Sequence, residues 1–198
     1  MKDVAILAPS FFDMTGTSVC MGGGERYLVD LVQLLRSLGY DPAVYQASSA
    51  GGWAKRYRDI EVHGLGGSGS IFKRDGSLSH TFSKATRGTD RAIYFRMDLG
   101  HPEPKKRSIG VSHGIWWDYP GITGNYYRED DGIRYLLESV SRLGCIVAND
   151  TNMINWYRCM APGADLRFRY IPNYVDSRVF ALNPAEAVSY THLTLPTN

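Results

Sequence analysis

Three consecutive glycines, Gly22, Gly23 and Gly24, stand immediately before a segment with helical periodicity. Glycine has no Cβ atom, so a ligand can approach its backbone N–H group closely, and a helix N-terminus adds about half a positive charge. This combination predicts a phosphate-binding turn; the alternative is a flexible loop that leads into a helix. No Gly-Lys-Ser/Thr follows, which excludes a Walker loop, and Tyr27 stands where a dinucleotide fingerprint has its third glycine.

A second candidate is His113, which follows a strand predicted at 108–112. An imidazole at the carboxyl end of a parallel strand can donate or accept a hydrogen bond in a ligand crevice at neutral pH. The adjacent Gly114 permits a sharp turn at this point. The alternative is a structural histidine packed into the core. No spacing of His, Asp and Glu residues is typical of a metal site, so we expect no metal.

Aromatic side chains are dense between residues 116 and 127. Their rings can stack on sugar rings or cover apolar acceptor groups, while their OH and N–H groups form hydrogen bonds. An equal alternative is that they attach this loop to the core. As candidates for acceptor binding we take Trp116, Trp117, Asp118, Tyr119 and Asn149.

Residues 64–69 match the pattern G-x-G-x-x-G. A dinucleotide fingerprint must open an amphipathic helix, and residues 70–76 lack the periodicity of one. We therefore interpret this glycine-rich segment as a flexible, lid-like loop.

Alternating strands and helices position these candidates. Residues 4–8 are an apolar run typical of a strand buried on both faces, and leucines and valines at helical spacing follow. Strands are predicted at 4–8, 41–46, 60–65, 92–95, 108–112, 145–148 and 168–171, and helices at 28–38, 133–143 and 151–160. This order predicts an α/β protein with a Rossmann-like, doubly wound, mainly parallel sheet. Ligands bind beyond the carboxyl ends of such strands, which selects the loops at 9–24, 112–128 and 148–152.

Composition excludes several classes of protein. The 198 residues are 43% hydrophobic and have a net charge of +2, far from the basic excess of a nucleic-acid-binding protein. Residues 50–110 hold twelve Lys or Arg against six Asp or Glu, which suits an anionic substrate or membrane surface, or a solvated face. The three cysteines form no CxxC pair, and no apolar run approaches membrane-spanning length. We expect a cytoplasmic protein.

Four segments together resemble the N-terminal half of a GT-B glycosyltransferase, of the retaining, family 4-like group that uses nucleotide-sugar donors. In the fourth segment, residues 171–176, this group usually has Gly at the position that Tyr174 occupies here. The resemblance covers residues 1–180. It rests on Gly22-Gly-Gly-Glu-Arg26 with its leucine-striped helix, His113 after the middle strand, Val147-Ala-Asn-Asp-Thr151, and Ile171-Pro-Asn-Tyr-Val-Asp176.

The resemblance implies two Rossmann-like domains that face each other across a cleft. Residues 1–176 would form the acceptor-side domain and residues 177–186 the start of the interdomain linker. Residues 187–198 look like a non-native read-through tail, so we expect the donor-binding domain to be absent and this fragment to be inactive. Catalysis of this kind needs no divalent metal or other cofactor.

The same resemblance implies roles for the candidate residues. Gly22, Gly23 and Gly24 would lie against the donor's phosphates and sugar, or frame the acceptor pocket. His113 would be the catalytic-site residue near the transferring sugar and would form a hydrogen bond with a hydroxyl. The acceptor would be a glycan or a lipid-linked glycan, the latter at the inner face of a membrane, with no nucleic acid as partner.

Two other classes of function remain open on the sequence. A nucleotide-dependent oxidoreductase needs a true fingerprint and an acidic residue after the second strand, where this chain has Tyr45-Gln46. A non-enzymatic binding module that acts with a separate donor-binding subunit is the alternative to the glycosyltransferase.

Overall fold

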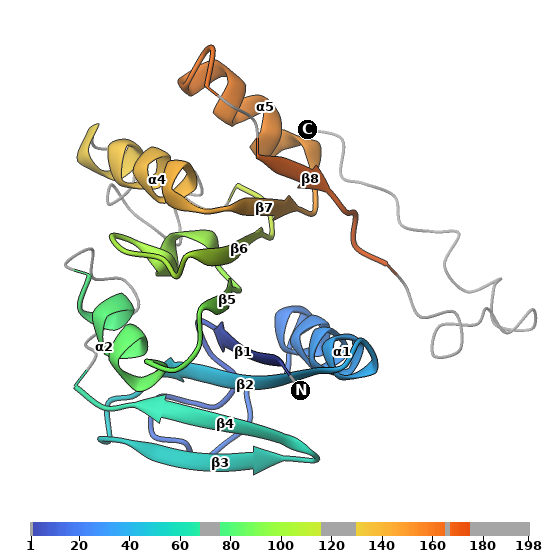
Figure 1. The fold of residues 1–198 in the computed structure, drawn as a ribbon, viewed down its shortest axis with the longest axis vertical. Helices are drawn as coiled ribbons and strands as arrows, with labels where there is room; N and C mark the ends of the chain where they lie inside the picture. Colours follow the sequence, from blue (N-terminus) through green and yellow to red (C-terminus); the bar gives the residue numbers. More distant parts are fainter. Residues whose placement is uncertain (1, 68–75, 116–129, 165–166, 175–198) are drawn as a thin grey trace, which may run out of the picture.

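The computed structural model describes residues 2–67, 76–115, 130–164 and 167–174. These residues form one eight-stranded sheet with helices on both faces (Figure 1), which is the α/β, Rossmann-like fold expected from the sequence. The elements in chain order are β1 (Lys2–Leu7), α1 (Gly23–Ser37), β2 (Tyr40–Ala47), β3 (Trp53–Tyr57), β4 (Ile60–Leu65), α2 (Ser77–Ala85), β5 (Arg91–Tyr94), the 3-10 helix η1 (Met97–Gly100), β6 (Arg107–Ser112), α4 (Asp130–Arg142), β7 (Cys145–Ala148), α5 (Thr151–Met160) and β8 (Phe168–Tyr170).

Strand β1 lies inside the sheet, whose order is β3-β4-β2-β1-β5-β6-β7-β8. From β1 the chain first builds the half that contains β2 and β4, and then returns to build β5 to β8 on the other side. All pairs are parallel except β3 with β4. The direction of winding therefore reverses between β1 and β5, and this switch point is where doubly wound sheets bind ligands.

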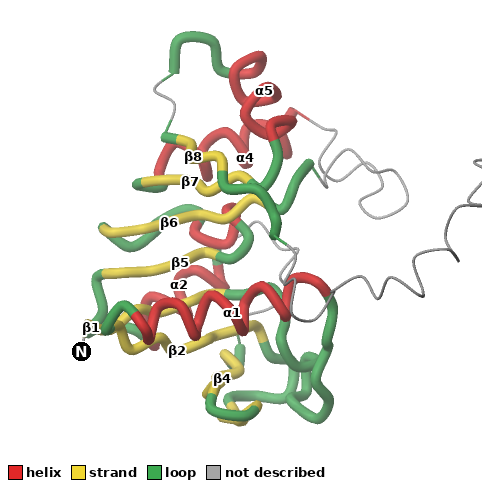
Figure 2. The backbone as a smooth tube through the Cα atoms, turned by 90° about the vertical axis from the view of Figure 1, so that its right-hand side faces the viewer, coloured by secondary structure: helices red, strands yellow, loops and turns green. Residues whose placement is uncertain are grey.

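Alternate residues of β1 supply the two cores of the molecule. Val4 and Ile6 pack on the face that α1 covers, together with Leu28 and Val32 of that helix. Ala5 and Leu7 face the opposite side, where α2, α4 and α5 pack. Figure 2 shows α1 crossing in front of the sheet, with α2 behind it. Because both faces of β1 are covered from Val4 onward, residues 4–7 form a continuous apolar run without polar alternation.

The long loop between β1 and α1 is held by the side chain of Gln46, at the end of β2. Its Oε1 accepts hydrogen bonds from the backbone N–H groups of Phe11 and Phe12 at 2.9 and 2.8 Å. Its Nε2 donates to the backbone oxygens of Phe12 and Ala47 at 3.0 and 3.3 Å. Gln46 is fully buried, so this amide replaces water for backbone groups that would otherwise lack partners.

Among the described elements, the sequence analysis did not predict β3, α2 and the short 3-10 helix η1. Strand β3 is an antiparallel edge strand with an exposed, basic middle, and α2 is rich in Ser and Thr, so neither has strong periodicity. The lid-like interpretation of residues 64–69 is wrong at its start, because Gly64 belongs to β4. A Cβ at Gly64 would lie 2.2 Å from the Trp53 ring, and one at Gly66 would lie 2.4 Å from the backbone of Gly51. Close packing explains these glycines; residues 68–75 lie outside the described residues.

Candidate functional site

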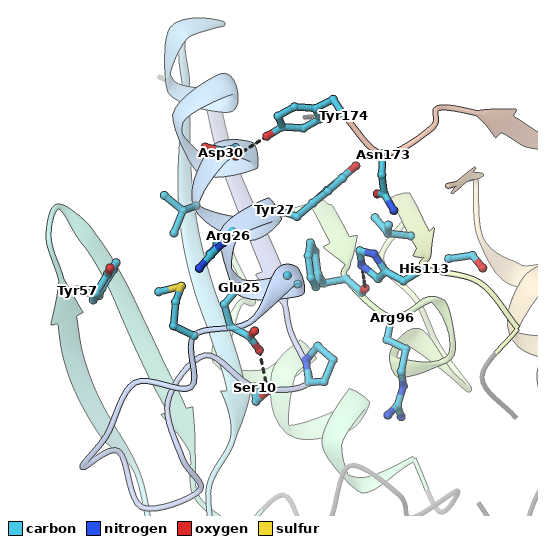
Figure 3. Close-up of a pocket in the computed structure, with 18 of the residues that line it drawn as sticks. Ser10, Glu25, Arg26, Tyr27, Asp30, Tyr57, Arg96, His113, Asn173 and Tyr174 are labelled. Atoms are coloured by element: carbon cyan, nitrogen blue, oxygen red, sulfur yellow. Dashed lines mark hydrogen bonds between the residues drawn. The ribbon is translucent and has the colours of Figure 1, made fainter. Parts of the chain in front are cut away.

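A pocket of about 1130 Å³ opens at the switch point, between the first turn of α1 and the carboxyl ends of β5 and β6 (Figure 3). Gly23, Gly24 and His113 all line it. The structure therefore brings the glycine turn and the imidazole into one cavity. The other described lining residues are Pro9, Ser10, Met21, Glu25, Arg26, Tyr27, Val29, Asp30, Tyr57, Arg58, Phe95, Arg96, Met97, Val111, Ser112, Asn173 and Tyr174.

The glycine turn lies at the N-terminus of α1, with Gly22 as the N-cap residue. A Cβ at Gly23 would meet nothing within 4 Å, and one at Gly24 would make an ordinary contact with Phe95 at 3.7 Å. Packing within the described residues therefore does not require glycine at either position. Both glycines line the pocket, where a ligand can reach the N–H groups of the first helical turn.

Glu25 places a carboxylate at this helix N-terminus. Its Oε2 accepts a hydrogen bond from the Gly22 N–H at 2.9 Å, and its Oε1 accepts one from the Ser10 hydroxyl at 3.2 Å. The carboxylate offsets part of the helix dipole's positive charge. The phosphate prediction did not take this charge into account: an incoming phosphate would meet a negative group, whereas a sugar hydroxyl would meet an acceptor.

His113 stands across the pocket from the glycine turn, at the end of β6. Its Nε2 lies 3.1 Å from the Phe95 carbonyl oxygen, and its Nδ1 lies 3.1 Å from Nδ2 of Asn149. The ring packs against Phe95 and meets Tyr27 edge-on, with centroid distances of 4.6 and 5.4 Å. This partial burial lowers the pKa of His113 below its usual value, against weaker opposing effects of the Phe95 carbonyl and the Glu25 carboxylate.

Asn149 is buried behind His113, and it is not among the described residues that line the pocket. Its Nδ2 also donates to Oδ1 of Asn173 at 2.8 Å. The predicted role of Asn149 in acceptor binding stays a prediction. Four further acceptor candidates lie outside the described residues: Trp116, Trp117, Asp118 and Tyr119.

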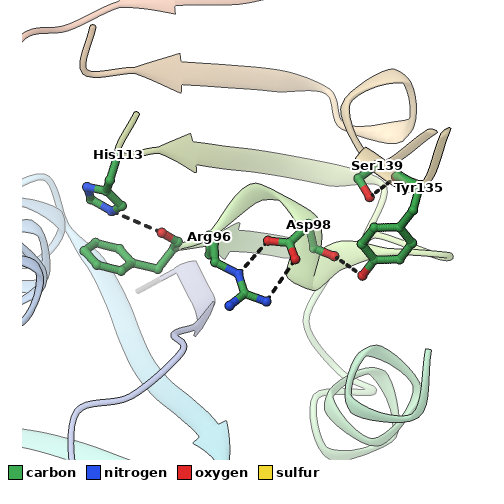
Figure 4. A network of polar contacts seen from close by, with 6 residues as sticks. Arg96, Asp98, His113, Tyr135 and Ser139 are labelled. Carbon is green, nitrogen blue, oxygen red and sulfur yellow. Dashed lines mark hydrogen bonds and ion pairs between the residues drawn. The ribbon is translucent and has the colours of Figure 1, made fainter. Parts of the chain in front are cut away.

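An ion pair that the sequence analysis missed lies beside His113 (Figure 4). Nε and Nη2 of Arg96 donate to the two carboxylate oxygens of Asp98 at 2.6 and 2.9 Å. Asp98 is 1% exposed, and its backbone oxygen accepts a hydrogen bond from the Tyr135 hydroxyl at 3.1 Å. The two-point contact fixes the guanidinium at the pocket. The available signal was that Arg96 follows the strand predicted at 92–95.

The segment after β8 completes the pocket on the side of α1. The Tyr174 hydroxyl donates a hydrogen bond to the Asp30 carboxylate on α1, and Asn173 lies next to Tyr27 and His113 in Figure 3. On the other side of α1, the pocket continues toward β3, where Tyr57 and Arg58 line it. Residues on both sides of the first turns of α1 therefore line this pocket.

The structure also bears on the other classes of function. Gln46 stands where a dinucleotide-binding fold needs an acidic side chain for the ribose, and its amide is occupied by the loop between β1 and α1. Within the described ranges, no three His, Cys, Asp or Glu residues form a group that could hold a metal ion. In the same ranges, no helix has the length and apolar character to cross a membrane.

Comparison with known proteins gives likeness in fold alone. The chain matches no protein-family model and no curated protein sequence. A solved structure of sucrose-phosphate synthase from Thermosynechococcus elongatus superposes with a TM-score of 0.63 at 11% identity, over 90% of this chain and 50% of that one. A second structure of sucrose-phosphate synthase from the same organism gives a TM-score of 0.55 at 10% identity, over 93% of this chain and 96% of that chain. The chain thus spans about half the length of the first of these proteins, and its Rossmann-like fold is similar to part of that structure.

Proposed function

We propose that this domain is the acceptor-side half of a GT-B glycosyltransferase that moves a hexose from a nucleotide sugar to a glycan or lipid-linked acceptor with retention of configuration. The observation that carries the proposal is the shared pocket at the switch point, where the open glycine turn, the Glu25 carboxylate and His113 face one another. The likeness in fold to sucrose-phosphate synthase and the sequence motifs around the pocket support the same class of enzyme.

The pocket has the mixture of groups that sugar binding requires. Tyr27, Phe95 and Tyr174 present aromatic rings for the apolar face of a sugar, while Glu25 and Asn173 present oxygen and amide groups for its hydroxyls. These groups come from three separate parts of the fold, which fixes their relative positions. The pocket therefore suits a neutral ring bordered by hydroxyls.

His113 acts through Nε2–H in this proposal. A backbone oxygen only accepts hydrogen bonds, so the contact with Phe95 places the proton of the neutral ring on Nε2. A substrate hydroxyl at this edge would share that proton with the Phe95 carbonyl or take its place. The ring then orients the transferring sugar. The lowered pKa of His113 keeps the imidazole neutral at pH 7.

The leaving diphosphate needs positive charge that this pocket supplies only in part. Arg96 already neutralises Asp98, and the Glu25 and Asp30 carboxylates also line the cavity. Stabilisation of the leaving group is a major part of catalysis in phosphate-leaving reactions. We therefore assign the donor's diphosphate mainly to a second lobe, the donor-binding domain, which would close over this pocket. The reaction needs no metal ion in this scheme.

The acceptor is the least constrained part of the proposal. Arg26 and Arg58 line the pocket on the β3 side of α1. Residues 50–110 hold more basic than acidic side chains, so this segment carries excess positive charge. Both features support an acceptor with an anionic group, such as a phosphate-linked glycan at the inner face of a membrane. The reaction would then take place in the cytoplasm.

Two-dimensional NMR titration of the ¹⁵N-labelled chain tests the site. A neutral methyl glycoside should shift the signals of Gly23, Gly24 and His113, and His113→Ala should weaken that response about tenfold, whereas Asn152→Ala, an exposed matched control, should leave it unchanged. Titrations with UDP-glucose, GDP-mannose and NAD complete the set. A response to NAD with none to any sugar would refute the glycosyltransferase. Steady-state assays with the same donors should show turnover near background, and robust turnover would remove the need for a second lobe.

A further inference from the structure

Three side chains from separate parts of the sheet edge form a hydrogen-bonded row beside the pocket. His113 follows β6, Asn149 follows β7 and Asn173 follows β8. Asn149 is the middle member: its Nδ2 lies 3.1 Å from Nδ1 of His113 and donates to Oδ1 of Asn173 at 2.8 Å. Asn149 is 7% exposed, so water does not compete for this amide.

The two partners of His113 require the same tautomer. The Phe95 carbonyl oxygen can only accept, which places the proton on Nε2. Nδ1 of the neutral ring then carries a lone pair, and Nδ2 of Asn149 is a donor aimed at it. If the amide of Asn149 were reversed, its oxygen would face this lone pair and the Asn173 oxygen. The observed orientation is therefore the one in which Nδ2 of Asn149 can donate to both His113 and Asn173.

Asn149 adopts this orientation although its own oxygen gains nothing from it. Oδ1 of Asn149 is buried and has no hydrogen-bond partner among the described residues. Buried polar atoms are nearly always paired, so an orientation that leaves one unpaired indicates that the two bonds of Nδ2 determine it. The amide nitrogen, with its contacts to His113 and Asn173, is the functional part of this side chain.

We propose that Asn149 is a positioning residue that holds His113 in the Nε2–H tautomer and connects it, through Asn173, to the segment that leaves β8. Asn149 therefore acts through His113. The tautomer itself follows from the contacts of this chain, whereas its value for sugar transfer rests on the proposed function. With Nδ1 occupied, His113 presents only its Nε2–H edge to a substrate, and a change in the segment after β8 reaches the imidazole through a single amide.

The charged and titratable groups around His113 define the background for a pH experiment. Glu25 and Tyr27 face the ring from α1, and Arg96 follows β5 close to it (Figures 3 and 4). Asp150, the N-cap residue of α5, lies beside Gly114. None of these groups belongs to the row formed by His113, Asn149 and Asn173, so substitution of Asn149 leaves them in place.

Nitrogen-15 NMR of the histidine side chains tests the proposal without any substrate. In the unaltered chain, His113 should show the Nε2–H tautomer at neutral pH. Asn149→Asp replaces the donor by an acceptor, which favours a proton on Nδ1 as well, so the pH midpoint of His113 should move upward. Asn149→Ala removes the donor and should produce a smaller upward shift. Asn173→Ala should produce the smallest shift, and the exposed control Asn152→Ala should produce none.

Two results would overturn the assignment. The first is an Nδ1–H tautomer in the unaltered chain, a measurement that does not depend on whether any variant folds. The second is an unchanged His113 midpoint in a folded Asn149→Asp variant, which would reduce Asn149 to a structural residue. Neither readout involves sugar binding. If the unaltered chain shows the Nε2–H tautomer but no response to the methyl glycoside, only the proposed function is refuted. If it responds to the glycoside but shows the Nδ1–H tautomer, only the role of Asn149 is refuted.

Discussion

The two walls of the pocket are built by different means. The helix-mouth wall (residues 9, 10 and 23–27) combines the open backbone of Gly23 and Gly24 with side chains of the first helical turns. Hydrogen bonds from side chains to backbone groups hold this wall: Gln46 holds the loop after β1, and Glu25 holds Gly22. The sheet-edge wall (residues 95–97, 111–113 and 173) presents side chains that hold one another, as in the contacts of His113 with Asn149 and of Arg96 with Asp98.

Substitutions in the two walls should therefore have different consequences for stability and for ligand binding. In the helix-mouth wall, Gln46 is far in sequence from the loop that it holds and is not among the described lining residues, so its substitution can damage the loop without removing a ligand contact. In the sheet-edge wall, the side chains that would touch a ligand are also the partners of buried polar groups. Substitutions there change stability and ligand contacts together.

Loss of the Gln46 amide should have the largest effect on the helix-mouth wall. Gln46→Ala leaves the N–H groups of Phe11 and Phe12 and two backbone oxygens without this partner. Each unpaired buried group costs about 1–3 kcal/mol, so we expect the free energy of unfolding to fall by about 4 kcal/mol after partial relaxation of the loop. Urea unfolding measures this loss. Gln33→Ala, on the exposed face of α1, is the matched control and should change stability by less than about 0.5 kcal/mol.

The Arg96–Asp98 pair should produce the next largest effect, in the sheet-edge wall. Asp98→Asn removes the charge that balances a largely buried guanidinium, and breaking a buried pair from one side costs about 3–5 kcal/mol. Arg96 faces the pocket and can recover part of its hydration, so we expect a loss of about 2–3 kcal/mol in urea unfolding. The variant should also bind inorganic phosphate more tightly than the parent chain does. Unchanged phosphate binding would show that Asp98 does not limit the positive charge at the pocket.

The two walls also differ in how far the sequence could predict them. The glycine turn is recognisable because Gly22, Gly23 and Gly24 form one contiguous segment before a helix with an apolar stripe. Short apolar runs predict most of the strands within a few residues. The row from His113 to Asn173 joins the ends of three strands, and a single sequence does not state which strands are neighbours. The contact of Asn149 with His113 and the place of Arg96 at the pocket therefore could not be predicted, and the role of Asn149 in acceptor binding stays a prediction. The contact of Glu25 with the Gly22 N–H depends on the conformation of the first helical turn, which the structure supplies.

The pH dependence of stability tests the sheet-edge wall with a smaller effect. Burial lowers the pKa of His113 in the folded chain below the usual value near 6.5. The unfolded chain therefore binds more protons than the folded chain as the pH falls through that value, and the free energy of unfolding decreases. His113→Gln removes this contribution, so the variant should lose less stability than the parent between about pH 7.5 and pH 5.5 in urea titrations. A steeper loss in the variant would mean that the folded chain favours the charged ring.

The smallest change in stability should come from a substitution in the glycine turn. This substitution also tests whether the open space at Gly23 is used by a ligand. A Cβ at Gly23 meets no atom within 4 Å, so Gly23→Ala should raise the free energy of unfolding by about 0.5 kcal/mol, because alanine loses less backbone entropy in a helix. Gly64→Ala is the contrasting control: its Cβ would lie 2.2 Å from the Trp53 ring, so we expect a loss of about 1–3 kcal/mol. If the space at Gly23 exists for a ligand, the stabilised Gly23→Ala variant should bind the methyl glycoside about tenfold more weakly in the NMR titration, a difference of about 1.4 kcal/mol. Unchanged binding would mean that the sugar does not approach this turn. The glycine turn of the helix-mouth wall would then have a structural role only, and the sugar would contact the sheet-edge wall.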